Sequence, residues 1–304
     1  MPTMQGAFSP SLRRWVYERL SGDPGTKKLD VGAKMLDSDF TGFVRANGLQ
    51  LYVQRGGLGE TLFYISGTGG DLRNKPNQFD SPLAQHFNLL CFDQRGLGQS
   101  GKPSGEYTMV DYANDAAALL DQIADEPVRV IGVSYGGMVA QELAVRYPEK
   151  IRSLLLVCTS SGGAGRPSYP LHELEAFEPA ERVKRHLQIS DTRRTDEWIT
   201  ENAEQWHKLL EMSLAGRRTD RDEVGAMKQL NARKLHDTFD RLPDLTMPVL
   251  LQGGLYDGIA PPDNMRELQG AIPHAELRFY EGGHLFFIQD RRAYPDMIEW
   301  LAAH

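Results

Sequence analysis

The stretch from residue 128 to residue 147 constrains the fold more than any other part of the chain. It begins as an apolar run at 128–133, passes through Gly132-Val133-Ser134-Tyr135-Gly136, and continues as an amphipathic helical pattern. Glycines on both sides of a serine are typical of a turn whose backbone segments approach each other closely. The order strand, turn, helix therefore predicts a serine at the start of a helix, where free N–H groups favour negative charge.

Other apolar runs repeat the strand pattern on both sides of this stretch, at residues 61–65, 88–92, 153–158, 248–252 and 275–280. Helical patterns separate most of these runs, and Asn47-Gly48 predicts a hairpin turn near the beginning. Strands that are apolar throughout and alternate with helices predict an α/β fold with a mostly parallel central sheet flanked by helices. Ligands of such sheets bind beyond the carboxyl ends of the strands.

The alternation of strands and helices divides the chain into three parts. Residues 1–39 are polar and rich in turn formers, so we expect an N-terminal extension. Residues 40–158 and 243–304 carry the strands and form the predicted core. Residues 159–242 contain helical patterns without a strand pattern, and this insert is too long for a simple connection. It is therefore predicted to be a helical cap, or lid, over the strand ends.

Charge and composition restrict the partners. The chain has 34 Lys and Arg against 41 Asp and Glu, a net charge of −7, which argues against nucleic acid or an anionic membrane. We find no secretory signal near Met1 and no apolar run of about 20 residues, so a soluble, cytoplasmic protein with a small-molecule substrate is expected. Cys91 and Cys158 are interpreted as reduced core thiols, and no spacing indicates a metal site.

A serine hydroxyl becomes a good nucleophile only when a base takes its proton. Of the eight histidines, His284 is the best candidate, because two glycines precede it between the last predicted strand and the last helix. The base in turn needs a carboxylate to orient it. Asp257 follows the strand that ends at residue 252, and its nearest rival is Asp263, which is interpreted as a helix cap.

The chain order Ser134, Asp257, His284 on this framework resembles the α/β-hydrolase superfamily. The resemblance covers residues 40–303, including the loop from Asp93 to Ser100 and the helical insert after the sixth strand. It implies an oxyanion hole made of two backbone N–H groups, those of Tyr135 and Thr68. Many relatives carry His-Gly where this chain has Ser66-Gly67, so the histidine that often steadies this loop is absent.

The residues and the resemblance together predict a serine hydrolase that acts on a carboxylic ester or a lactone through an acyl-enzyme. C–C bond hydrolysis, amide or peptide hydrolysis, perhydrolysis and a receptor-like protein with slow turnover remain alternatives. Residues 96–101 match Gly-x-Gly-x-x-Gly, but Lys102-Pro103 follows where a phosphate-binding helix should run, so no cofactor is expected. The candidate pocket residues are Arg73, a candidate partner for a substrate carboxylate, and Trp198, Trp206 and Met212.

Overall fold

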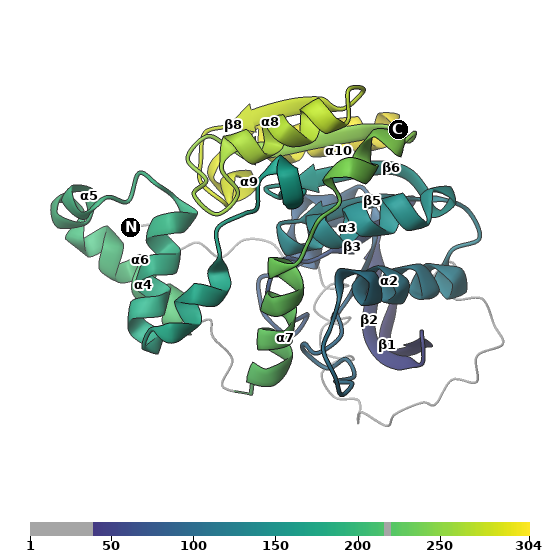
Figure 1. Ribbon diagram of the computed structural model, residues 1–304, viewed down its shortest axis with the longest axis horizontal. Coiled ribbons are helices and arrows are strands. Elements are labelled where there is room, and N and C mark those ends of the chain that lie inside the picture. The colour runs from purple at the N-terminus through teal and green to yellow at the C-terminus, as the bar shows by residue number, and fades with distance from the viewer. Residues whose placement is uncertain (1–38, 216–219) are drawn as a thin grey trace, which may run out of the picture. The chain divides into compact units, whose positions relative to one another are not determined.

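The computed structural model describes residues 39–215 and 220–304, and the predicted N-terminal extension therefore lies almost wholly outside the described residues. The described chain forms an eight-stranded sheet in the order β1-β2-β4-β3-β5-β6-β7-β8 (Figure 1). The strands are β1 (Phe40–Ala46), β2 (Leu49–Gly57), β3 (Thr61–Ile65), β4 (Asn88–Phe92), β5 (Val128–Val133), β6 (Ile151–Val157), β7 (Val249–Gly254) and β8 (Glu276–Tyr280). Pairing is antiparallel from β1 to β4 and parallel from β4 to β8, which confirms the predicted fold class.

The first hairpin follows the predicted turn. Asn47 and Gly48 both adopt positive φ, at 48° and 72°, and they connect Ala46 to its cross-strand partner Leu49. Positive φ at both central residues is the requirement of a two-residue hairpin turn that matches the twist of the strands.

The sheet is covered on both faces, and neighbouring residues of one strand point to opposite cores. In β6, Leu154 and Leu156 belong to one buried cluster, while Leu155 and Val157 belong to another. The first cluster includes residues of the three helices α2 (Met109–Ile123), α3 (Tyr135–Arg146) and α8 (Pro262–Ala271). The second includes residues of α9 (Phe286–Gln289) and α10 (Ala293–Ala303). Burial of both faces explains why these strands read as continuous apolar runs.

Helix α2 begins where the sequence predicts. Thr108 accepts a hydrogen bond from the backbone N–H of Asp111, and the Asp111 side chain accepts one from the Thr108 N–H. This reciprocal capping box satisfies two of the N–H groups that a helix start leaves unpaired. Helices α2 and α3 then pack side by side on the sheet (Figure 1).

The insert between β6 and β7 is helical in the part of the chain that the structure describes. It contains the short helix η5 (Leu171–Ala176) and the helices α4 (Pro179–Ser190), α5 (Asp196–Glu201), α6 (Ala203–Ala215) and α7 (Glu223–Lys234). Leu171, Leu174 and Leu230 of this insert form a buried cluster with Ile259, which follows β7. The insert therefore packs directly on a loop at the carboxyl end of a core strand.

Across the two described stretches of the chain, we find no helix with the length and apolar character needed to span a membrane.

Candidate active site

Ser134 occupies a tight turn between β5 and α3. Its φ and ψ are 55° and −116°, a conformation that L-residues rarely adopt. A Cβ atom on Gly136 would lie 2.0 Å from the carbonyl oxygen of Ile65, and one on Gly132 would lie 2.5 Å from the carbonyl oxygen of Gly136. Both positions therefore require glycine because backbone fills the space around the turn. The turn holds the serine at the strand end, where a strained backbone is typical of a functional site.

The structure brings together the serine, histidine and aspartate predicted from three separate strand ends. Nδ1 of His284 donates to Oδ2 of Asp257 at 2.8 Å, and Ser134 Oγ lies 2.9 Å from Nε2 of His284. The other oxygen of Asp257 accepts from the N–H groups of Ile259 and Ala260 at 2.7 and 2.9 Å. A carboxylate accepts hydrogen bonds only, so this network places the proton on Nδ1 and leaves Nε2 free to accept from the serine.

The rival carboxylate, Asp263, lies elsewhere. It is exposed in the first turn of α8 and pairs with Arg266 and Arg166 at 2.9 and 3.2 Å. An acidic side chain in the first turn of a helix interacts favourably with the helix dipole.

Cys158 lies beside the His284–Asp257 pair, a proximity that sequence reasoning missed. It is fully buried with a φ of 42°, and its sulfur lies within 4.8 Å of ligand atoms of both residues. Burial raises the pKa of the Cys158 thiol. Burial also opposes charge on His284, but the Asp257 carboxylate beside the ring favours the charged form more strongly, and the pKa of His284 is raised above its ordinary value.

The loop after β3 passes next to the serine. A Cβ atom on Gly67 would lie 3.5 Å from the Cβ atom of Ser134, so the two backbones are close. Tyr135 is the first residue of α3, where the N–H group has no partner within the helix. Thr68 and Gly69 line the cavity described below. The assignment of the Tyr135 and Thr68 N–H groups as oxyanion donors stays a prediction.

Two buried glutamines hold this loop in a chain that lacks the usual histidine. Nε2 of Gln94 donates to the carbonyl oxygen of Ser66 at 2.8 Å, and Oε1 of Gln229 accepts from the N–H of Gly69 at 2.9 Å. Gln229 belongs to α7 and is completely buried. Sequence reasoning missed both residues, because no local signal connects a glutamine to a loop 28 positions away, as for Gln94, or 160 positions away, as for Gln229.

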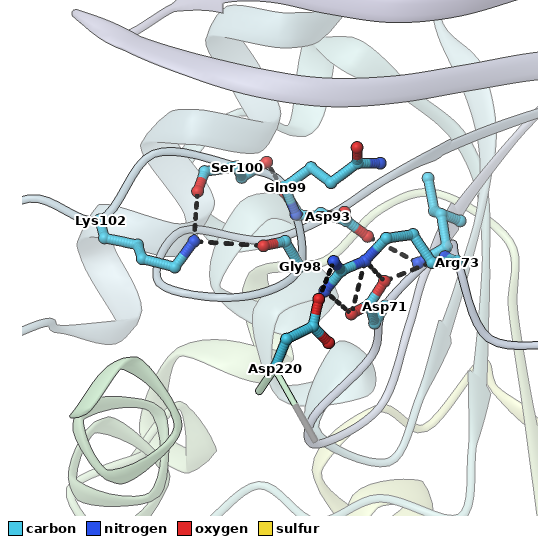
Figure 2. Close-up of polar contacts among 9 residues, drawn as sticks. Asp71, Arg73, Asp93, Gly98, Gln99, Ser100, Lys102 and Asp220 are labelled. Atoms are coloured by element: carbon cyan, nitrogen blue, oxygen red, sulfur yellow. Dashed lines mark hydrogen bonds and ion pairs between the residues drawn. The ribbon is translucent and has the colours of Figure 1, made fainter. Parts of the chain in front are cut away.

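Arg73 is held by two carboxylates. Its guanidinium contacts Asp71 at 2.6 Å and Asp220 at 2.7 Å (Figure 2). Close by in the same view, Asp93 accepts from the N–H groups of Leu72 and Gln99, both at 2.8 Å. Burial raises the pKa of Asp93 to about 6, although these N–H groups act in the opposite direction. Arg73 is not among the residues that line the cavity.

The glycine-rich loop at 96–101 has a structural role in this network. A Cβ atom on Gly98 would lie 2.1 Å from Oδ2 of Asp93, and Gly98 has a φ of 49°. The next helix, α2, begins only at Met109. The loop therefore wraps around Asp93 and does not lead into a helix start that could bind a phosphate.

A cavity of about 380 Å³ lies between the loop after β3 and the helical insert. Its lining residues are Thr68, Gly69, Leu171, Leu174, Glu175, Arg182, Val183, His186, Leu187, Met212, Ser213, Arg221 and Leu230. Of the candidate pocket residues, Met212 lines the cavity. Trp206 is buried in α6, Trp198 is half-buried in α5, and neither lines the cavity. The cavity reaches Thr68, so a ligand in it can contact the loop beside Ser134.

Fold, site geometry and comparison with known proteins agree on the family. A family model described as the alpha/beta hydrolase fold matches residues 60–291, and the chain belongs to this family of hydrolases. A poly(3-hydroxyalkanoate) depolymerase of Ectopseudomonas oleovorans is 30% identical over 237 residues, which cover 78% of this chain and 82% of that protein.

Solved structures share the fold at lower identity. An enol-lactonase from Burkholderia xenovorans has a TM-score of 0.70 at 20% identity, covering 86% of this chain and 100% of the other. An esterase from Exiguobacterium antarcticum has the same TM-score and the same coverage at 18% identity.

Proposed function

We propose that this protein is a serine hydrolase that cleaves a carboxylic ester or a lactone through an acyl-enzyme. The observation that carries the proposal is the continuous hydrogen-bonded chain from Asp257 through His284 to Ser134. Its final member stands on a strained turn whose two glycines are sterically required. This arrangement joins a nucleophile, a base and an orienting carboxylate, the parts that acyl transfer needs.

In the first half of the proposed reaction, Ser134 Oγ attacks the carbonyl carbon while Nε2 of His284 takes the hydroxyl proton. Asp257 keeps the ring oriented and stabilises the imidazolium. The N–H groups of Tyr135 and Thr68 donate to the oxyanion, which in such sites is a large contribution to catalysis. The intermediate then expels the alcohol, which leaves with the proton held by His284.

In the second half, water attacks the acyl-enzyme and gives its proton to His284. The second tetrahedral intermediate collapses, the bond to Ser134 Oγ breaks, and the histidine returns the proton to the serine. The carboxylic acid is released and the free enzyme is restored. A lactone follows the same steps, except that ring opening leaves the alcohol as part of the acyl group, so hydrolysis of the acyl-enzyme releases a hydroxy acid.

Ester or lactone chemistry is preferred over the alternatives because the similar proteins named above include a polyester depolymerase, an enol-lactonase and an esterase. The cavity of about 380 Å³ supports a small-molecule substrate bound under the helical insert.

The test is turnover of a p-nitrophenyl ester series by the wild type and by Ser134→Ala. We expect kcat to fall about 10⁴-fold or more in the variant, with an unchanged thermal unfolding curve. Ser104→Ala, at an exposed loop serine, is the matched control. Mass spectrometry of a quenched reaction should show an acyl group on the Ser134 peptide. Full turnover by Ser134→Ala would refute the proposal. A wild type that makes one turnover without releasing the product would indicate the receptor-like alternative.

A further inference from the structure

Apolar, acidic and basic side chains line the cavity beside the Thr68 loop, together with Thr68, Gly69, His186 and Ser213. Six are apolar, namely Leu171, Leu174, Val183, Leu187, Met212 and Leu230. Three others are charged acids or bases, namely Glu175, Arg182 and Arg221. Apolar side chains accommodate a hydrocarbon chain, whereas a charged group in such surroundings needs a partner of opposite sign. The partners of the charged groups therefore indicate what the ligand has to supply.

Arg182 has its partner within the protein. Its terminal nitrogen forms a close ion pair with Glu175, and a second nitrogen lies 3.5 Å from the carbonyl oxygen of Phe177. Both members of the ion pair are largely buried, with side-chain exposures of 17% and 19%. The Arg182–Glu175 pair contributes no net charge to the cavity.

Arg221 has no comparable partner among the residues that the structure describes. Its one ion pair joins Nε to Glu223 at 3.8 Å, and Glu223 is 70% exposed. The two acids next to Arg221 in sequence are engaged elsewhere. Asp220 pairs with Arg73 (Figure 2), and Asp222 accepts from the N–H of Gly225 at the start of α7. Within the described part of the chain, no carboxylate closer than that of Glu223 balances the charge of Arg221 at the cavity.

We propose that Arg221 binds a carboxylate at the far end of the substrate's acyl chain. The substrate class is then the half-ester of an aliphatic dicarboxylic acid, or a lactone that carries a carboxylate on an aliphatic chain. The ester group lies at Ser134, the hydrocarbon chain contacts the apolar lining, and the guanidinium pairs with the terminal carboxylate. Arginine suits this role because its planar fork matches both oxygens of a carboxylate.

The inference rests on the proposed ester hydrolysis and adds the specificity of the same site. It also replaces Arg73, the arginine considered for this role from sequence, because two carboxylates already hold Arg73 outside the cavity lining.

The test compares p-nitrophenyl half-esters of adipic, suberic and sebacic acids with the uncharged hexanoate, octanoate and decanoate esters. We expect the wild type to have the higher kcat/KM for the half-ester at one or more chain lengths. Arg221→Gln should lower the ratio of kcat/KM for that half-ester to kcat/KM for the matched neutral ester by about 10- to 100-fold. Arg221→Lys should restore part of the preference, since it keeps the charge but not the fork.

Arg185→Gln is the matched control. Arg185 lies on α4 one turn from Arg182, pairs with Glu181 at 2.7 Å and does not line the cavity, so its loss should leave the half-ester preference unchanged. Free adipate should inhibit the wild type more strongly than Arg221→Gln. A wild type without a half-ester preference at any length, or an equal loss on both ester series in Arg221→Gln, would overturn the inference. Failure to hydrolyse any ester in either series would refute the proposed function itself.

Discussion

Gln229 is expected to set the position of the loop beside Ser134, and Gln229→Met tests this. Methionine has nearly the volume and flexibility of glutamine, so packing is preserved while the amide is lost. The side-chain oxygen accepts from the N–H of Gly69 at 2.9 Å, and the glutamine is completely buried. Gly69 is half-buried and lines the cavity, so the bond lies at the cavity wall.

The expected magnitude follows from this one contact. A fully buried N–H left without an acceptor costs about 1–3 kcal/mol, which is an upper bound for the half-buried Gly69. If the loop shifts to relieve that cost and the proposed Thr68 donor moves with it, kcat falls by about 5- to 150-fold. KM should change little, since oxyanion donors act mainly on the transition state. Stability should change by less than about 1 kcal/mol, because Nε2 of Gln229 has no partner among the described residues and its removal offsets the lost bond.

The assay is steady-state hydrolysis of a neutral p-nitrophenyl ester, combined with urea unfolding of each variant. Gln229→Glu is the matched control, because a carboxyl oxygen can still accept from Gly69, and Arg233 lies one helical turn further on. We expect this variant to keep most of the wild-type kcat. A wild-type kcat in Gln229→Met, or equal loss in both variants, would contradict a positioning role that depends on the acceptor.

Two further predictions concern the turn and the base. Gly136→Ala places a Cβ atom 2.0 Å from the carbonyl oxygen of Ile65, so urea unfolding should show a loss of about 3 kcal/mol or more, whereas Gly270→Ala, where a Cβ meets nothing within 4 Å, should be neutral or stabilising. His284 must be neutral to accept the serine proton, so its raised pKa predicts that kcat/KM rises with pH through a midpoint above the ordinary histidine value. An acid limb with its midpoint at or below about pH 6.5 would contradict this reasoning.

The sequence predicted the fold because its strands are buried on both faces and read as apolar runs. It also indicated Ser134, Asp257 and His284. Each follows the end of a predicted strand, and each has a polar or ionisable side chain that the packing of a hydrophobic core does not require. The structure brings these three together because the carboxyl ends of β5, β7 and β8 lie at one edge of the sheet. Local patterns were sufficient to predict these three residues, because the carboxyl ends of neighbouring parallel strands lie at the same edge of a sheet.

Other parts of the site depend on contacts between segments that share no local pattern. Sequence reasoning selected Arg73 for the pocket, whereas folding pairs it with Asp71 and Asp220 and places Arg221 in the cavity lining. It interpreted Cys158 as a core thiol and gave no sign that the sulfur lies near His284. A sequence gives the charge and type of each residue. Which residue neutralises a given charge depends on how segments that are distant in sequence pack together.

The sequence by itself thus determined the geometry of the Ser134 turn, because the turn, its glycines and the following helix are contiguous. The tertiary structure alone decided which residues hold the neighbouring loop and which cavity cation lacks a close carboxylate among the described residues. The physical reason is distance along the chain: Gln229 contacts Gly69 across 160 positions, and no short-range preference encodes such a contact.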